Sequence, residues 1–303
     1  MADEKYPNLS VVLPAYNEAG SVGSLLTELL KHLRESKLSF EAILVDDGSQ
    51  DNTAEKAGAL KAEFPELTVI RHPYNKGNGS AIKTGLRAAR GRAVVCMDSD
   101  GQHNFRELLR LYEHIGEYDL VVGARTQSYQ SQPVRKFGNW VFNQLARTLT
   151  QFPIQDLTSG FRAFRREAIA PYIDLLPARF SYPTTSTLIF LKAGYNVKYV
   201  PVDMLPRSQG SSKIKVVRDG WRFFVIILKI AVLFEPLQIF LPVAMLFLLM
   251  ALASTAYASL AVDRLFIPNS GSLFFSISVL VFLLGLVAEQ ITNLQIASSK
   301  NGR

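Results

Sequence analysis

The sequence predicts an α/β domain built on a parallel sheet, followed by two membrane-spanning helices. Three observations carry this prediction. Short β-rich runs alternate with helical patterns over residues 8–123, polar clusters follow several of those runs, and two long uncharged apolar runs lie between residues 236 and 288. An alternating βαβα order is typical of a parallel sheet with helices on both faces and ligands at the carboxyl ends of its strands.

The expected strands are short and apolar, and they cover residues 10–13, 42–45, 68–70, 93–97 and 120–122. Patterns with helical spacing separate them, at about residues 20–34, 52–63, 79–90 and 104–115. The first strand is not followed by Gly-x-Gly-x-x-Gly, and the chain has no P-loop motif. Dinucleotide oxidoreductases and P-loop enzymes therefore lose their main support.

The composition excludes further classes of protein. Hydrophobic residues make up 48% of the 303 residues and charged residues 19%, which excludes a disordered chain. The single cysteine, Cys96, excludes a disulfide framework and a cysteine-based zinc site, and we expect it to be buried. The first residues lack the basic and apolar regions of a signal peptide, so we expect the N-terminal part in the cytosol.

The charge is unevenly distributed along the chain. The net charge is −4 over residues 1–120, +11 over residues 121–230 and zero over residues 231–303. A basic block beside an apolar one fits an anionic membrane surface better than nucleic acid, so membrane lipids are expected partners and nucleic acid is not. A solvated basic face is the alternative.

The two uncharged runs, residues 236–262 and 265–288, each exceed the roughly 20 residues that cross the hydrocarbon core of a membrane. Basic residues precede the first run and follow the second, so the positive-inside rule predicts an integral protein of the cell (inner) membrane with both ends in the cytoplasm. We expect spans at about 236–262 and 269–291. Buried core helices of a soluble protein are the alternative, and association of copies through the spans stays open.

The domain organisation follows from these patterns. We expect a cytosolic domain over residues 1–212, an interfacial helix over 213–234 and a transmembrane hairpin over 235–303. Helical spacing in 213–234 gathers the basic residues on one side and apolar residues on the rest, which is typical of a helix lying in the membrane interface. Residues 137–149 repeat the pattern more weakly, and packing on the cytosolic domain is the alternative there.

An acidic pair after the fourth strand is the most specific chemical feature. Asp98 and Asp100 leave a buried strand two residues apart and would repel each other unless a cation lay between them. Hard oxygen ligands select Mg²⁺ or Mn²⁺, which would bridge a substrate diphosphate, and Gln102 offers a third oxygen. His103 is interpreted as a supporting or capping residue. The other histidines lack metal-ligand spacing and are interpreted as surface residues: His32, His72 and His114.

Together these motifs resemble the family 2 glycosyltransferases with a GT-A fold, on residues 11–18, 45–49, 75–81 and 98–103. Residues 122–125, 158–162 and 207–213 are similar to the polyprenyl-phosphate branch, the dolichol-phosphate mannose and undecaprenyl-phosphate sugar synthases. The resemblance covers about residues 8–230, and bacterial members also carry two C-terminal spans. Ser99 and Gly101 depart from the mannosyl members, which leaves the sugar open. The absence of Gln-x-x-Arg-Trp favours transfer of a single sugar.

The resemblance implies roles for the matching positions. The nucleotide would be held by Pro14, Ala15, Tyr16, Glu18, Val45 and Asp47, with Asp46 and Ser49 shaping that turn. The metal would be held by Asp98, Asp100 and Gln102, and the catalytic residues would be Asp98, Asp100 and Arg125. The acceptor phosphate would meet Arg125, Arg135, Asn139, Arg207 and Lys213, and the acceptor loop would comprise Ser159, Gly160, Phe161 and Arg162. Solvated charge is the alternative for Arg135, and Asp156 could either take part in catalysis or cap a turn.

The activity implied is inverting transfer of one sugar from GDP-mannose or a UDP-hexose to dolichyl or undecaprenyl phosphate. A phosphate oxygen is already anionic at neutral pH, so this acceptor needs no general base. Two alternatives stay open. One is an inactive membrane scaffold that binds nucleotide-sugar or lipid, and the other is a transferase acting on a glycan or protein, which would need a carboxylate base beside the acceptor.

Overall fold

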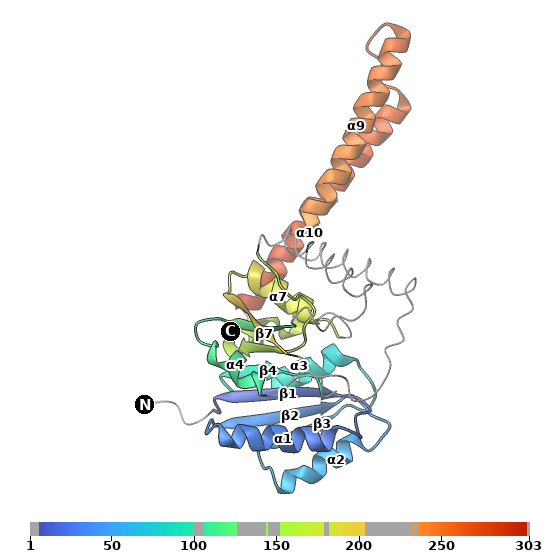
Figure 1. The fold of residues 1–303 in the computed structure, drawn as a ribbon. Coiled ribbons are helices and arrows are strands. Elements are labelled where there is room, and N and C mark those ends of the chain that lie inside the picture. Colours follow the sequence, from blue (N-terminus) through green and yellow to red (C-terminus); the bar gives the residue numbers. More distant parts are fainter. Residues whose placement is uncertain are drawn as a thin grey trace. The chain divides into compact units, whose positions relative to one another are not determined.

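The computed structural model describes residues 6–99, 106–125, 144, 152–178, 182–203, 232 and 236–301. The chain divides into two compact units, Met1–Asp219 and Gly220–Arg303, which we describe separately. The first contains the sheet and the second the long apolar helices (Figure 1). The predicted interfacial segment, 213–234, and the predicted boundaries on either side of it lie outside the described residues, apart from Val232. The weaker amphipathic segment, 137–149, does too, apart from Gln144.

The strands of the first unit form one seven-stranded sheet in the order β3-β2-β1-β4-β6-β5-β7. Their bounds are β1 Leu9–Ala15, β2 Phe40–Asp46, β3 Leu67–Arg71, β4 Ala93–Cys96, β5 Leu120–Arg125, β6 Arg162–Arg165 and β7 Val197–Val202. All five predicted strands are present, with ends that differ from the predicted ones by up to three residues. The parallel pairing of β1 with β2 and β4, and of β2 with β3, brings the carboxyl ends of these strands to one edge.

The five predicted strands run in the same direction, as expected, but the sheet as a whole is mixed because the sequence does not predict β6. Strand β6 lies between β4 and β5 and runs antiparallel to both, while β7 pairs in parallel with β5 at the edge of the sheet. Neither strand has the sequence of a typical buried strand. Strand β6 is four residues long and both begins and ends with arginine, and β7 contains Pro201, which an edge strand tolerates.

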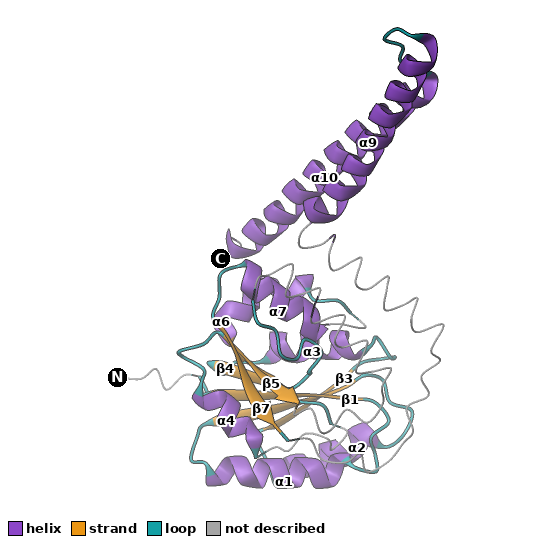
Figure 2. Ribbon diagram, turned by 45° about the horizontal axis from the view of Figure 1, so that its top comes forward, coloured by secondary structure: helices purple, strands orange, loops and turns teal. Residues whose placement is uncertain are grey.

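Helices cover both faces of the sheet (Figure 2). On one face α1 buries its leucines in a continuous core with residues of α2, α4 and the sheet. On the other, α3 packs so closely on β1 that a Cβ at Gly85 would lie 2.2 Å from Val12 Cγ1, and Phe190 of α7 contacts Phe164 of β6. The helix bounds are α1 Val22–Glu35, α2 Thr53–Ala59, α3 Asn78–Ala88, α4 Glu107–Glu113, α6 Arg166–Ile169 and α7 Tyr182–Lys192.

The second unit contains two antiparallel helices, α9 (Pro236–Val262) and α10 (Asn269–Asn301). The first coincides with the predicted span, and the second continues ten residues past the predicted end at 291. Both are long and apolar enough to cross a membrane, and most of their hydrophobic side chains face outward. Small residues permit close packing between them, since a Cβ at Gly285 would lie 2.7 Å from Phe240 Cβ. The Ser278 hydroxyl donates to the Ala244 carbonyl at 2.8 Å, so a polar group in the apolar pair is satisfied.

Candidate active site

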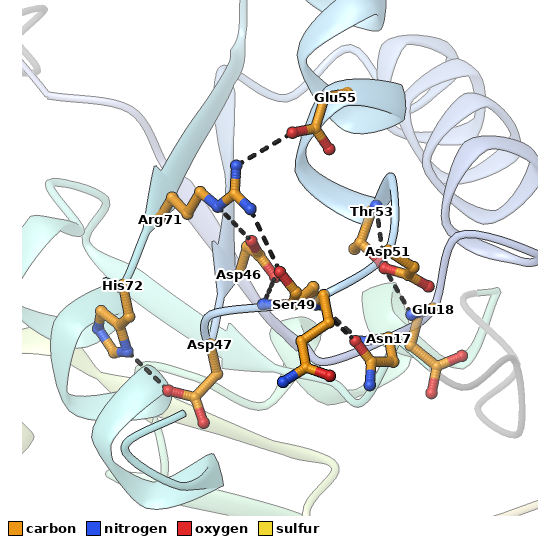
Figure 3. Close-up of polar contacts among 11 residues, drawn as sticks. Asn17, Glu18, Asp46, Asp47, Ser49, Asp51, Thr53, Glu55, Arg71 and His72 are labelled. Atoms are coloured by element: carbon orange, nitrogen blue, oxygen red, sulfur yellow. Dashed lines mark hydrogen bonds and ion pairs between the residues drawn. The ribbon is translucent and has the colours of Figure 1, made fainter. Parts of the chain in front are cut away.

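The loops after β1 and β2 are fastened to each other at the carboxyl edge of the sheet. The Asn17 N–H donates to Ser49 Oγ, and the Gln50 N–H donates to Asn17 Oδ1, each at 2.9 Å. Within the second loop, the N–H and hydroxyl of Ser49 donate to Asp46, which also forms an ion pair with Arg71 at 3.3 Å (Figure 3). Asp46 and Ser49 therefore shape the turn that follows β2.

Asp47 points in a different direction from Asp46, toward His72 (Figure 3). Its side chain is buried, and Oδ1 lies 2.7 Å from His72 Nδ1. The interpretation of His72 as a surface residue is wrong, since only 6% of the residue is exposed. A topological signal was present in the sequence. His72 directly follows β3, which places it at the same edge of the sheet as the polar clusters after β1, β2 and β4.

The end of β4 is joined to β1 and to the segment before β6. The Ser99 hydroxyl donates to the Pro14 carbonyl at 2.7 Å. Asp98 is half-buried, and a Cβ built on Gly160 would lie 3.1 Å from its Oδ2 atom and 3.3 Å from the hydroxyl of Tyr182. That hydroxyl donates to the Gly160 carbonyl at 2.8 Å. Gly160 therefore sits directly beside Asp98 and leaves space that a side chain would fill.

Arg125, at the end of β5, is half-buried and forms an ion pair with the buried Asp156. Its Nε donates to Asp156 Oδ2 at 2.7 Å, and its Nη2 donates to Asp156 Oδ1 at 3.0 Å and to the Thr158 hydroxyl at 2.6 Å. Asp156 also accepts the N–H groups of Thr158 and Ser159, both at 3.1 Å. The described geometry therefore agrees with the turn-capping alternative for Asp156, and it adds an ion pair that orients Arg125.

The ion pair shifts the pKa of both partners toward the charged forms. Burial raises the pKa of Asp156, but the hydrogen bonds and charge of Arg125 outweigh it, so the pKa is lowered overall. Burial likewise acts to lower the pKa of Arg125, and the hydrogen bond and charge of Asp156, with a smaller effect from Asp98, raise it overall. Asp156 is therefore a weak base, and Arg125 is a fixed cation close to Asp98.

Three of the four predicted acceptor-loop residues are enclosed in the fold. Ser159, Phe161 and Arg162 are each at most 2% exposed, and Arg162 belongs to β6 rather than to a loop. The Arg162 guanidinium donates to neutral oxygens: the carbonyls of Ser159 and Pro183 and the hydroxyls of Ser186 and Thr187. Burial lowers its pKa. Its side chain fastens the segment before β6 to α7 and does not reach a surface acceptor.

The residues predicted to hold the nucleotide differ in accessibility. Tyr16 is 42% exposed and Glu18 is half-buried, so both side chains can reach a ligand. Pro14, Ala15 and Val45 are buried within β1 and β2, and Val45 has no exposed surface. Several predicted residues lie outside the described residues, so their roles stay predictions: Asp100, Gln102, Arg135, Asn139, Arg207 and Lys213.

The described part of the predicted metal site is compatible with a hard divalent cation. Asp98 supplies a half-buried carboxylate at the end of a strand, and Gly160 leaves room beside it. Among the described residues, no three His, Cys, Asp or Glu side chains converge as a metal-binding group. The other predicted ligands fall within residues 100–105, which the structure does not describe.

A mixed sheet with helices on both faces, acidic residues at its carboxyl edge and an apolar hairpin defines a GT-A glycosyltransferase fold with a membrane-type C-terminal unit. The chain belongs to glycosyl transferase family 2, whose model matches residues 10–172. A second model, the GtrB C-terminal hairpin, matches residues 235–294. With the apolar helices it indicates a membrane-anchored protein.

Several curated proteins are similar in sequence. Glycosyltransferase AglD of Haloferax volcanii is 34% identical over 70% of this chain and 35% of its own length. The dolichyl-phosphate β-glucosyltransferase ALG5A of Trichomonas vaginalis is 32% identical over 53% of this chain and 54% of its own. The undecaprenyl-phosphate mannosyltransferase of Micrococcus luteus is 29% identical over 67% of this chain and 86% of its own. The chain thus matches about a third of AglD and about half of ALG5A. These relatives confirm the resemblance to the polyprenyl-phosphate branch.

Among solved structures, glucosyl-3-phosphoglycerate synthase of Mycobacterium tuberculosis with Mn²⁺, UDP and glucosyl-3-phosphoglycerate aligns with a TM-score of 0.56 and 19% identity. The alignment covers 74% of this chain and 78% of that one. The same enzyme with Mg²⁺ and UDP aligns with a TM-score of 0.54 and 20% identity, over 67% of this chain and 73% of that one. At these identities the likeness shows the fold, and it confirms the predicted GT-A architecture.

Proposed function

We propose that the protein transfers a single sugar, with inversion, from a nucleotide-diphospho-sugar to a polyprenyl phosphate. The donor would be GDP-mannose or a UDP-hexose, and the acceptor dolichyl or undecaprenyl phosphate. The observation that carries the proposal is that two features occur in one chain. The first is a family 2 sheet with Asp98, Gly160 and Arg125 at its carboxyl edge, and the second is an apolar hairpin. The names of the relatives support the same acceptor class.

The donor would lie against the loops after β1 and β2. Tyr16 and Glu18, two of the predicted nucleotide ligands, are accessible in the first loop, and Asp47 holds the neighbouring segment in place. Asp98, with Asp100 and Gln102, would hold Mg²⁺ or Mn²⁺ on the diphosphate, where a divalent cation neutralises the charge of the leaving group.

The acceptor phosphate would meet Arg125, Arg135, Asn139, Arg207 and Lys213, with Gly160 at the margin of its site. A phosphate oxygen attacks the anomeric carbon while the bond to the nucleoside diphosphate breaks on the opposite face, which inverts the centre. Cations are needed because two anionic substrates must approach each other. Asp156, the carboxylate that pairs with Arg125, is held as a weak base by that ion pair. This arrangement suits a phosphate acceptor better than a hydroxyl acceptor, which must lose a proton.

The membrane hairpin would place the long-chain acceptor beside the catalytic unit. We further propose that both chain termini and the catalytic domain are cytoplasmic, because basic residues precede the first span and follow the second. Anionic membrane lipids would then contact the basic block of residues 121–230.

The test uses the purified full chain in detergent with labelled GDP- and UDP-sugars and extracted polyprenyl phosphates. We expect release of nucleoside diphosphate that depends on polyprenyl phosphate, with one sugar in the lipid product at the inverted anomeric configuration. Nucleotide-sugar binding without release would indicate the inactive scaffold. Release that requires a glycan or protein instead of lipid would contradict the acceptor assignment.

A further inference from the structure

The His72 ring is enclosed between the loop after β2 and helix α3. Its Nδ1 atom lies 2.7 Å from Asp47 Oδ1, and its Nε2 atom lies 2.9 Å from the hydroxyl oxygen of Thr84 on α3. Both ring nitrogens therefore have a partner, and a carboxylate oxygen only accepts hydrogen bonds. Nδ1 must carry the proton donated to Asp47, and in the neutral ring Nε2 then accepts from the Thr84 hydroxyl.

Asp47 uses both of its carboxylate oxygens to hold the segment that leads into α3. Oδ1 accepts the Lys76 N–H at 3.0 Å, and Oδ2 accepts the Gly77 N–H at 2.7 Å. Gly77 has a φ of 102°, a backbone conformation that glycine adopts without strain. The direction of the Asp47 carboxylate therefore determines where residues 76 and 77 lie, and His72 determines that direction.

The same segment rests on the loop after β2. Gly48 has a φ of 72°, and a Cβ there would lie 2.4 Å from the carbonyl carbon of Tyr74. Gly48, Ser49, Arg71, His72 and Pro73 line a cleft of about 300 Å³. The loop after β2 and the segment from 72 to 77 thus form one wall that borders open space at the carboxyl edge of the sheet.

We propose that His72 is a positioning residue of the nucleotide site, which fixes Asp47 and thereby preforms the wall against which the donor binds. The inference rests on the proposed function for the donor side. His72 acts through Asp47 and has no part in the chemical step. Its loss raises the free energy of forming the donor site, because the wall must then be ordered at the moment of binding.

Three substitutions separate the two hydrogen bonds of the ring. His72→Ala removes both, and Thr84→Val removes only the bond at Nε2. His72→Asn is the rescue variant, because its side-chain amide can donate to Asp47 from about the position of Nδ1. Should His72→Ala fail to fold, His72→Gln replaces it, because its longer side chain carries the amide toward Thr84. The matched control is His114→Asn, since His114 ends α4 and lies toward the opposite edge of the sheet.

The primary measurement is the Kd of UDP and of GDP, each with Mg²⁺, by calorimetry on the full chain in detergent. A hydrogen bond to a charged group contributes enough that its loss raises Kd by about tenfold to a hundredfold. We expect this for His72→Ala, and a smaller rise for Thr84→Val and His72→Asn, each of which keeps the bond to Asp47 and loses the bond to Thr84. His114→Asn should stay within about twofold of wild type.

Two further readouts separate positioning from a general loss of stability. In turnover assays the KM of the donor should rise, while kcat at saturating donor and the KM of the lipid acceptor stay near wild type. Amide exchange should quicken at residues 76 and 77 in His72→Ala but not in β1 or β4. A nucleotide Kd that is unchanged in His72→Ala, or in His72→Gln where it replaces that variant, would overturn this inference and leave the proposed function intact. Failure of the wild-type chain to bind either nucleotide would overturn the proposed function, and the inference with it.

Discussion

Single side chains at the carboxyl edge of the sheet divide into those committed to the fold and those accessible to substrates. The carboxylates of Asp46, Asp47 and Asp156 accept backbone N–H groups, and they pair with the side chains of Arg71, His72 and Arg125, respectively. Asp98 is half-buried, and a Cβ on Gly160 would lie 3.1 Å from its Oδ2 atom. The three paired carboxylates therefore fix the positions of the loops around Asp98, the predicted metal ligand.

Asp98→Asn should lower turnover by about a hundredfold or more, because a metal-held diphosphate contributes several kcal/mol to the transition state. The fold should be unaffected, since the amide keeps the shape of the carboxylate. The measurements are the rate of nucleoside diphosphate release and Mn²⁺ binding to the same protein. Asp174→Asn is the control, because Asp174 is 83% exposed and pairs with Arg87 on the surface. Wild-type turnover in Asp98→Asn would remove the metal assignment.

The Arg125–Asp156 pair should make folding stability fall in acid. The pKa of Asp156 is lowered in the folded state, so its contribution is fully present above the unfolded pKa, near 3.9, and is lost as the pH falls through the folded pKa. Asp156→Asn should cost about 3 kcal/mol at neutral pH, since it leaves a largely buried guanidinium without its counterion. The difference in unfolding free energy from wild type should stay constant from pH 8 to 5 and shrink below about pH 4. A pH-independent difference would contradict the role of this pair.

At the scale of elements, the sequence predicts strands and helices whose hydrophobic residues recur at a regular spacing. It does not predict elements that are stabilised by contacts with residues far away in the sequence. Strands β1 to β5 are apolar runs between helical patterns, so each was predicted close to its observed bounds. The sequence does not predict strand β6, because its first residue is an arginine, which is unusual in a buried strand. Burial of this arginine depends on hydrogen bonds to a carbonyl and a hydroxyl of α7, which is distant in the sequence. The role of His72 was missed for the same reason, since it depends on two residues from other elements.

Arg162 joins β6 to α7, so its loss should weaken both elements together. Arg162→Met removes the donors to four neutral oxygens and should destabilise the protein by at least about 3 kcal/mol. Arg165→Met in the same strand is the matched control, because Arg165 is 44% exposed and its partner Asp119 keeps the hydrogen bond from the Asn196 N–H. Thermal unfolding of both variants gives the comparison. Equal melting temperatures for the two would show that the buried guanidinium does not hold these elements together.

At the scale of the whole molecule, the chain combines two units whose surfaces suit different surroundings, water for the first and the membrane for the second. The apolar core of the first unit is formed among its own strands and helices. The two helices of the second unit pack against each other through close contacts and the Ser278 hydrogen bond, and most of their apolar side chains face outward. Among the described residues, the core cluster of the first unit comprises residues between Leu9 and Val202. The hairpin is therefore expected to serve the acceptor and not the stability of the sheet.

Deletion of residues 236–303 tests this division. The shortened chain should fold, melt near the full-length protein in the same detergent and bind UDP or GDP with Mg²⁺ at a similar Kd. Its turnover should depend on the length of the acceptor. A short water-soluble polyprenyl phosphate should react at a rate within about tenfold of that with the full chain. A long-chain acceptor should react poorly, because the hairpin no longer holds the catalytic unit at the lipid surface where that acceptor resides. A shortened chain that does not fold would show that the hairpin also supports the core. One that processes both acceptors as the full chain does would show that anchoring is supplied by residues before 236, and the basic block of residues 121–230 would then be the segment to neutralise next.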